Sequence, residues 1–355
     1  MSVQDLVDKV ASMCPEGTPI PSPQWVKLQF WPKNPIAKAS LQYTGKLRVK
    51  FMVEAHQTRM WYQDAHYASA IFHHLKMLAI QYRDLCELVF MDDKHKCKVG
   101  EPNAPVAAVE RGKAVVVSVD GKKFSALDHD FTRCSITPSV TMFCHIPKDI
   151  EDSFYRGNVH VGLKDSTFQP SSANRHAAEL SKLLSQRDEK KPILFLYTDG
   201  GGDHNVTHVS TQISLINVFL KNDLDMLQAV RTPPYHSWKN PVERVNCILN
   251  LGLQSVGLMR ASMNDKYEAK IKSCKCVKDI RTLAQGDPNF KECFLDSLEP
   301  VKALLSSVFQ RLQLKYDPFQ VFMAASDSEI EELQNNILSI NGKTNSEFIE
   351  HCCHV

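Results

Sequence analysis

Residues 192–202 read Pro-Ile-Leu-Phe-Leu-Tyr-Thr-Asp-Gly-Gly-Gly, an apolar run that opens almost directly onto an acid and three glycines. A short apolar run closed by turn residues is typical of a buried strand, which we expect over residues 192–197. Glycine lets the backbone turn away at once. The sequence therefore places Asp199 where that strand ends.

Further strands and helices are expected on both sides of this run. Apolar residues at a spacing of three and four predict helices over residues 61–84, 175–187, 207–221 and about 240–258. Short apolar runs predict strands at residues 88–91, 114–119, 139–144, 158–163 and 225–230. This mixture of strands and helices predicts an α/β core that lies between residues 61 and 260, with the helix at 61–84 leading into it.

Composition excludes several classes of protein. The chain has 355 residues, of which 43% are hydrophobic, 14 are Gly and 18 are Pro, so it is neither disordered nor collagen-like. The net charge is 42 − 40 = +2, and any basic surface must therefore be local. No run approaches the ~18 apolar residues of a membrane span, so we expect no membrane partner. The first thirty residues lack a secretory pattern, and 11 scattered Cys suit reduced thiols in the cytosol or nucleus.

The two ends of the chain differ from this core. Residues 1–60 have a basic excess and Pro-containing stretches such as Pro19-Ile-Pro-Ser-Pro23, which predict an extended arm rather than a packed helix. Residues 261–355 are expected to form a helical region. Its charge changes along its length, because residues 260–281 carry seven Lys or Arg and residues 327–350 carry six acids.

Three carboxylates follow expected strand or helix ends. Asp92 closes one apolar strand and Asp199 another, while Glu243 lies in Asn240-Pro-Val-Glu-Arg244, where Pro241 suits the first turn of a helix. Carboxylates that converge from such ends repel one another unless divalent cations neutralise them, and Mg²⁺ or Mn²⁺ prefers carboxylate oxygen. Two such ions ~4 Å apart can activate a water or a 3′-hydroxyl in phosphodiester chemistry.

The motifs around these acids resemble those of DDE-type transposases and integrases, in particular the mariner/pogo-type superfamily and its bacterial relatives. The matching stretches are Val89-Phe-Met-Asp-Asp93, Leu196-Tyr-Thr-Asp-Gly200 and Tyr235-His-Ser-Trp-Lys-Asn-Pro-Val-Glu-Arg244. Tyr235-His-Ser-Trp-Lys239 departs from the Tyr-Ser-Pro-like loop of the family. The spacings are 199 − 92 = 107 and 243 − 199 = 44, and the second is longer than is common in mariner elements, which favours a divergent branch. The resemblance covers about residues 85–260, roughly half of the chain.

This resemblance implies a ribonuclease H-like fold, an α/β mixed sheet flanked by helices, with a helical appendage after it. It implies a transposon-derived polynucleotidyl transferase or nuclease that cleaves or joins DNA phosphodiesters. Asp92, Asp199 and Glu243 would be the catalytic and metal-binding residues, and would hold two Mg²⁺ or Mn²⁺ ions. The partner would be DNA, on which the protein could form a homodimer. Its location would be the nucleus, or otherwise the cytoplasm. Family members normally carry helix-turn-helix modules ahead of the core; only 91 residues precede Asp92, so we expect a truncated or domesticated element.

Several assignments stay open in the sequence. Asp93 is the alternative to Asp92 if the strand shifts by one residue, and Asp120 is a more distant one. Asp203, His204, His236 and Arg244 are candidate supporting residues, for a phosphate, a water or a neighbouring carboxylate. Ser171–His176, with Arg175, could bind a phosphate or simply cap a helix. Cys274, Cys276 and His351–His354 are residue types that bind zinc, but they would need to belong to a longer zinc site. Residues 260–281 could contact phosphates or form a solvated helix face.

Two other functions compete with the transposase hypothesis. One is a catalytically silent, domesticated DNA- or chromatin-binding protein that keeps the fold; its DNA binding would be insensitive to metal and to Glu243→Gln. The other is a structure-specific nuclease with the same core, which substrate preference would distinguish.

Overall fold

The computed structural model describes residues 3–29, 63–109, 134–233, 236–274 and 276–341. The chain divides into two compact units, Met1–Thr58 and Arg59–Val355. Among the described residues, no helix combines the length and the apolar character needed to cross a membrane.

The smaller unit contains two helices, α1 (Val3–Met13) and α2 (Pro23–Gln29), where the sequence predicted an extended arm. Val7 on α1 and Val26 on α2 are buried. The Ser22 hydroxyl accepts a hydrogen bond from the Trp25 amide at 3.2 Å, and Pro23 occupies the first helical position, where it costs no hydrogen bond. The proline that suggested an extended chain therefore begins a helix.

The larger unit is centred on a seven-stranded sheet. Its strands are β1 (Cys86–Asp93), β2 (Cys97–Val99), β4 (Cys134–Cys144), β5 (Gly157–Asp165), β6 (Ile193–Thr198), β7 (Met226–Arg231) and β11 (Gln320–Met323). They run in the order β11-β5-β4-β1-β6-β7, and β2 pairs with β4 beside this path. β4 is antiparallel to both β1 and β5, whereas β6 is parallel to β1 and β7 parallel to β6. This order and these directions are those of the ribonuclease H-like fold, as predicted.

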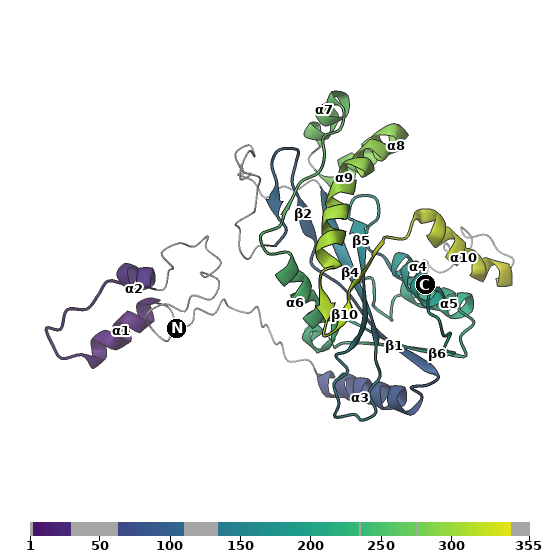
Figure 1. Ribbon diagram of the computed structural model, residues 1–355, viewed down its shortest axis with the longest axis horizontal. Helices are drawn as coiled ribbons and strands as arrows, with labels where there is room; N and C mark the ends of the chain where they lie inside the picture. The colour runs from purple at the N-terminus through teal and green to yellow at the C-terminus, as the bar shows by residue number, and fades with distance from the viewer. Residues whose placement is uncertain (1–2, 30–62, 110–133, 234–235, 275, 342–355) are drawn as a thin grey trace. The chain divides into compact units, whose positions relative to one another are not determined.

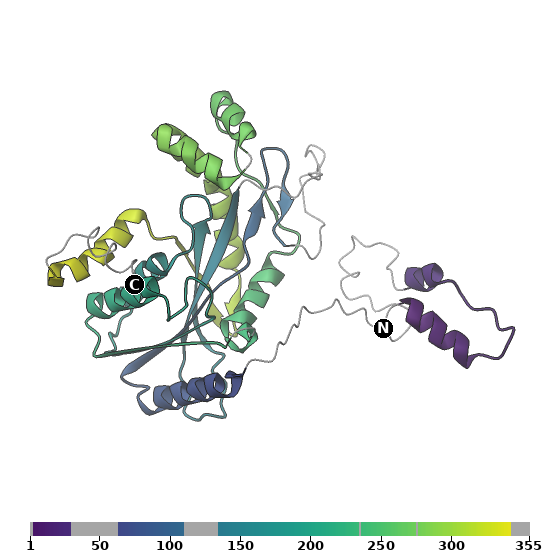
Figure 2. The same ribbon diagram turned by 180° about the vertical axis from the view of Figure 1, so that it is seen from behind.

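Helices cover both faces of the sheet (Figures 1 and 2). One face packs against α3 (Ala65–Gln81), α6 (Val242–Gly252) and α9 (Pro288–Phe309), and the other against α4 (Ala173–Ser185), α5 (Val209–Lys221) and α10 (Asp327–Asn341). Side chains of β1 alternate between these layers: Leu88 and Phe90 join the first core, and Val89 and Met91 join the second. The next two residues, Asp92 and Asp93, therefore also point to opposite faces of the sheet.

The strands predicted from apolar runs are present as β1, β4, β5, β6 and β7, and the first three predicted helices as α3, α4 and α5. The fourth helix, expected to reach about residue 258, ends as α6 at Gly252. Ser255 adopts a φ of 62°, which a helix does not accommodate, and Gly257–Leu258 forms β8, which pairs with β3 (Val106–Ala107). The predicted strand at residues 114–119 lies outside the described residues.

The region after residue 260 is not purely helical and contributes to the core. It contains α7 (Asp265–Ser273), α8 (Val277–Gly286), the hairpin of β9 (Gln313–Leu314) and β10 (Asp317–Pro318), and β11. β11 lies parallel to β5 at the edge of the sheet, with Phe322 paired to Gly162. A Cβ atom at Gly162 would lie 2.7 Å from the Phe322 ring, so glycine admits this side chain. α9 likewise buries Phe290, Phe294 and Leu298 completely in the first core.

This packing predicts that Leu298→Ala destabilises the central sheet and α9 together, in a single unfolding transition. Leu298 is fully buried, and a large-to-small change at such a position costs about 2–5 kcal/mol. Leu304→Ala, on the same helix at a side chain 40% exposed, is the matched control and should cost less than about 1 kcal/mol. Chemical denaturation followed by both circular dichroism and tryptophan fluorescence would measure this, and a separate transition for α9 would contradict it.

Candidate active site

Asp92 and Asp199 lie side by side because of the register of two parallel strands. β1 pairs with β6 so that Met91 is opposite Thr198, and each aspartate is the next residue. Phe90 and Tyr197 belong to the same core layer, which contains α6. Asp199 is half-buried, and its Oδ1 accepts a hydrogen bond from the amide of Gly201 at 3.1 Å, so the glycine run after β6 fixes this carboxylate.

Glu243 is brought to the same place by Asn240. The Asn240 side chain is completely buried, and its Nδ2 donates to the carbonyl oxygen of Met91 at 2.9 Å. Its Oδ1 accepts from the amide of Val242 at 3.3 Å, in the first turn of α6. One side chain thus ties the start of α6 to the end of β1. Glu243, also in that first turn, lies close enough to act on the charge of Asp92.

Asp92 is the most strongly perturbed of the three acids. Its side chain is buried, and Asn246 Nδ2 donates to its Oδ2 at 3.2 Å. Burial raises the pKa of Asp92 to about 8, and the negative charges of Asp199 and Glu243 add to the rise. Burial also raises the pKa of Asp199. The three predicted acids therefore converge and repel one another, as expected for ligands of divalent cations.

Asp93 points to the other face of the sheet, where it has a cation of its own. Lys164 is completely buried, with Nζ 3.4 Å from Asp93 Oδ1 and 3.3 Å from Glu179 Oε2. The Ser171 hydroxyl and the His176 ring also bind the Asp93 carboxylate. Burial alone would raise the pKa of Asp93, but His176, Lys164 and Ser171 outweigh it and hold that pKa well below its usual range. The alternation of β1 side chains thus gives the two candidate first acids different partners, and Asp92 is the one that lies beside Asn246 and Glu243.

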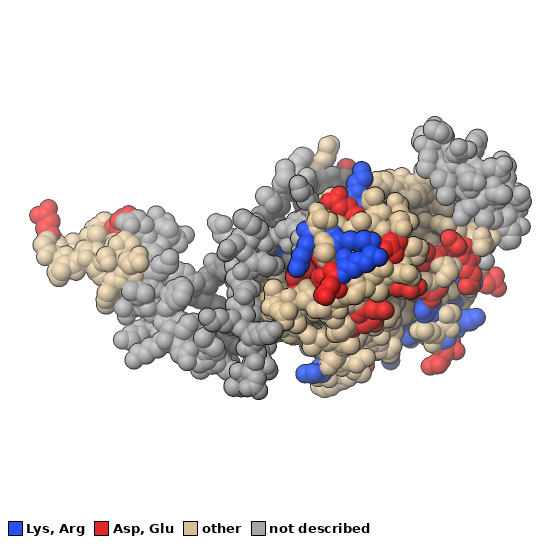
Figure 3. All heavy atoms as spheres, turned by 90° about the horizontal axis from the view of Figure 1, so that it is seen from above, with Lys and Arg blue, Asp and Glu red and all other residues tan. Residues whose placement is uncertain are grey.

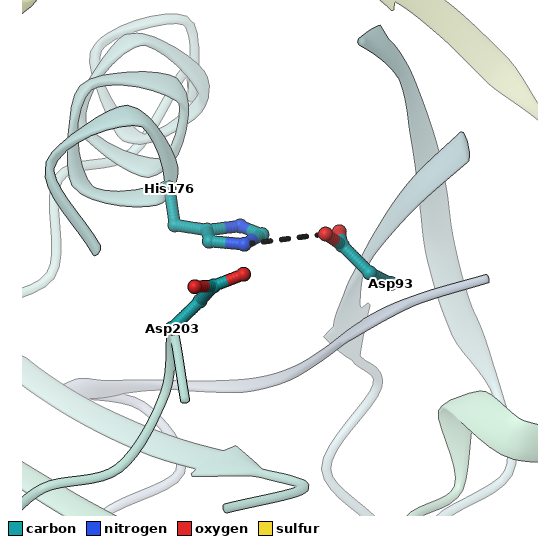
Figure 4. A group of neighbouring side chains, drawn as sticks. All are labelled: Asp93, His176 and Asp203. Atoms are coloured by element: carbon teal, nitrogen blue, oxygen red, sulfur yellow. Dashed lines mark ion pairs between the residues drawn. The ribbon is translucent and has the colours of Figure 1, made fainter. Parts of the chain in front are cut away.

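Asp93, His176 and Asp203 form a second group of metal-ligand types (Figure 4). One donor atom from each lies within 4.8 Å of the others, so the group could hold a metal ion. In the structure the Lys164 ammonium reaches this group, 3.0 Å from Nδ1 and 3.2 Å from Nε2 of His176. The His204 ring lies against the His176 ring with centroids 4.1 Å apart and an interplanar angle of 43°, and burial holds the pKa of His204 well below its usual range. His204 is therefore neutral at pH 7.

A hollow of about 1060 Å³ opens beside the three acids. Asp92, Asp93, Asp199 and Glu243 line one part of it. Lys94, His95 and Lys96 of the turn after β1 and Lys98 of β2 also line it. α6 adds polar residues that include the buried Asn246 and the exposed Asn250. The site is therefore accessible to a large ligand.

The other predicted residues have different surroundings. Arg244 lies over the Tyr155 ring at 5.4 Å, and His236 stands 6.2 Å from the Trp238 ring; neither lines the hollow. Ser172 caps α4, as the structural explanation predicted, and Arg175 donates to the carbonyl of Pro170 and pairs with Asp327 at 2.9 Å. Cys276 caps α8, while Asp120, Tyr235 and His351–His354 lie outside the described residues.

The basic segment at residues 260–281 is largely engaged within the protein. Arg260 is completely buried and bridges Glu101 and Glu268, each at 2.6 Å. Arg281 donates to the carbonyl of Thr167 at 2.6 Å, and Lys270 pairs with an acid at 3.0 Å. Figure 3, which looks onto the α7–α9 end of this unit, accordingly shows Lys and Arg side chains bordered by Asp and Glu. This arrangement favours the structural explanation of the basic run.

Sequence reasoning missed three residues that support the acids: Asn246, Lys164 and His176. Asn246 lies three residues after Glu243 on α6, so helical spacing places it on the same side, and this spacing could have identified it. The buried Lys164 gave no signal, because a lysine near the end of a strand is usually exposed.

Comparisons with known proteins leave the family open. No protein-family model matches the sequence, and no curated protein matches it. Among solved structures, the chain is similar to the Mos1 transposase paired-end complex with left transposon end, at a TM-score of 0.37 and 12% identity over 84% of this chain and 74% of that one. It is also similar to a pre-cleavage Mos1 transpososome, at a TM-score of 0.36 and 10% identity over 84% of this chain and 75% of that one. The Mos1 mariner paired end complex with Mn is similar at a TM-score of 0.35 and 12% identity, over 83% of this chain and 78% of that one.

The raised pKa of Asp92 predicts that Asp92→Asn stabilises the metal-free protein near pH 8. Below pH ~4 the carboxyl is neutral in both folded and unfolded states, so the variant gains nothing there. Between pH ~4 and about 8 the unfolded carboxyl ionises while the folded one resists, so the wild type loses stability with rising pH and the variant does not. We expect a gain on the order of a few kcal/mol at pH 8, measured by urea unfolding in EDTA.

Asp93→Asn is the matched control and should destabilise the protein, whereas Asp92→Asn stabilises it. It leaves the buried Lys164 ammonium with one carboxylate fewer, at a cost of about 3 kcal/mol at neutral pH. Because the pKa of Asp93 is lowered, this stabilisation is present above the unfolded pKa and fades as the pH falls through the folded one. Equal effects of the two substitutions would contradict the division of these acids between the faces of the sheet.

Asn240→Ala is expected to loosen the first turn of α6. The change leaves the Met91 carbonyl without its buried donor, which costs about 1–3 kcal/mol of unfolding free energy. Because Glu243 depends on this anchor, Mn²⁺ affinity should also fall, by roughly 10-fold or more. Calorimetric titration would measure it; an unchanged Mn²⁺ affinity in the folded variant would mean that Asn240 does not position Glu243.

Proposed function

We propose that this protein is a transposase-like polynucleotidyl transferase or nuclease that cleaves or joins DNA phosphodiesters with the help of two divalent metal ions. The observation that carries the proposal is the convergence of Asp92, Asp199 and Glu243 at the end of a ribonuclease H-like sheet, beside a hollow of about 1060 Å³. Two-metal phosphodiester chemistry requires such a set of carboxylates on an open, accessible edge.

The donor set fits Mg²⁺ or Mn²⁺. All three acids offer oxygen, the preferred ligand of these ions. Burial and then the charges of Asp199 and Glu243 raise the pKa of Asp92, and a divalent cation would oppose this rise. Asn246 adds a further oxygen, because its buried Oδ1 has no hydrogen-bond partner in the part of the chain described. Asp93 differs in having the Lys164 ammonium as its counter-charge.

Each residue then has a distinct role. Asp92, Asp199 and Glu243 would hold the ions, which when bound supply activation of a water or 3′-hydroxyl and stabilisation of the leaving oxygen. Asn246 orients the Asp92 carboxylate through its 3.2 Å hydrogen bond, and Asn240 orients Glu243 through the Met91 carbonyl. The buried side of Asp92 keeps water away from one face of the carboxylates and so strengthens their hold on a cation.

The proposal extends to the biology of the protein. DNA is the partner because a phosphodiester substrate matches this chemistry, and the nucleus is then the compartment in which such a substrate resides. A homodimer on DNA, an origin in a transposable element and a role in DNA integration or recombination belong to the same proposal. One Mos1 structure is described as a paired-end complex with the left transposon end, and we propose DNA binding for this chain on the chemistry of its own acids.

Glu243→Gln should abolish metal-dependent nicking of DNA. The amide keeps the size of the side chain but removes one of the three negative charges on which cation binding depends, so we expect a loss of roughly 100-fold or more. Conversion of supercoiled plasmid to the open-circular form in Mn²⁺ is the measurement. Glu299→Gln, at an exposed position on α9, is the control and should nick like the wild type.

A calorimetric titration distinguishes a metal site that binds Mn²⁺ without cleaving DNA from the lack of any metal site. Mn²⁺ binding that is present in the wild type and lost in Asp199→Asn would support the metal site. If DNA-bound wild type neither binds Mn²⁺ nor nicks, the proposal fails and the catalytically silent DNA-binding function takes its place.

A further inference from the structure

The hollow beside the acids has three kinds of lining, arranged on different elements. The carboxylates lie at the ends of β1 and β6 and the start of α6, the basic residues follow β1, and amides lie along α6. In both ribbon views β2 and α6 lie on the same flank of the sheet (Figures 1 and 2). Its volume of about 1060 Å³ is at the upper limit of small-molecule pockets, which suits a section of a polymer.

The basic lining follows from the alternation of β2. Cys97 and Val99 are buried, so Lys96 and Lys98, at the intervening positions, face the opposite way. Both lysines line the hollow, and Lys96 and the neighbouring His95 are exposed. Asp93 has the Lys164 ammonium as its counter-charge, so these lysines are not needed to neutralise it. Lys96 is exposed and lines the hollow, so it is placed to bind an anionic ligand.

The amide lining comes from one stripe of α6 and the turn after it. Asn246, Asn250 and Gln254 are spaced by four residues, and all three line the hollow. Asn246 is only 7% exposed, and among the described residues its Oδ1 has no partner although its Nδ2 binds Asp92. A buried acceptor of this kind points to a ligand or ion that occupies the hollow in the functional state.

We propose that this hollow is a track for one DNA strand, in which Lys96 binds a phosphate and the exposed amides of Asn250 and Gln254 bind sugars and base edges. The inference rests on the proposed function, because it takes the strand to be the one whose phosphodiester reaches the acids. Lysine supplies the sequence-independent phosphate contacts that dominate affinity, whereas amides form hydrogen bonds with neutral groups of the strand. The track therefore predicts affinity that falls as the salt concentration rises.

Fluorescence anisotropy with a labelled single-stranded DNA oligonucleotide tests this track. The full-length protein is titrated in Ca²⁺, which neutralises the acids, at several KCl concentrations. Lys96→Ala should reduce the slope of log affinity against log salt by about 0.7, the value for one phosphate contact on a single strand. Asn250→Ala should weaken binding by ~3-fold or more without changing that slope, because it removes a neutral contact.

Lys148→Ala is the matched control. Lys148 is exposed and follows β4, whose register places that end of the sheet away from Asp92. It should bind DNA like the wild type, and thermal unfolding should show that all three variants are folded. The track is overturned if the wild type does not bind the strand, or if Lys96→Ala and Asn250→Ala both bind like Lys148→Ala. These results are independent of nicking, so the track can fail while metal-dependent cleavage stands.

Discussion

Electrostatic repulsion among Asp92, Asp199 and Glu243 is the constraint on which the rest of the site depends. Three carboxylates do not stay together unless the surrounding structure holds them, and burial makes the penalty larger, as the pKa of about 8 for Asp92 shows. The parallel register of β1 and β6 fixes two of the acids, and the Asn240 amide fixes the third through the Met91 carbonyl. Stability at this point of the molecule is given up to keep three carboxylates together.

The pleat of β1 solves a second electrostatic problem. Asp92 and Asp93 are adjacent in sequence, yet one faces α6 and the other faces α4. Only Asp93 meets a buried ammonium, and the two neighbours consequently have pKa values shifted in opposite directions. A single strand thus presents one carboxylate without a counter-charge in the described part of the chain and one that is neutralised within the fold.

The sequence predicted much of this arrangement because the signals were local. Apolar runs located β1, β4, β5, β6 and β7, and acids at their ends located Asp92 and Asp199. Tertiary contacts account for what it missed. β11 is a four-residue edge strand whose position depends on β5 and on the absence of a side chain at Gly162. Lys164 is stabilised by acids far away in sequence, and the helix expected to reach residue 258 stops earlier because Leu258 pairs with Val106.

The edge position of β11 also bears on how the chain is made. Its partner β5 ends at Asp165, whereas β11 begins at Gln320. The edge of β5 therefore stays unpaired while about 155 further residues are synthesised (320 − 165 = 155). An unpaired strand edge is a site for association with other chains, and such distant pairings form slowly. During translation the nascent protein therefore passes through a stage at which the β5 edge of its sheet is unpaired. At that stage chaperone binding would be most effective against aggregation.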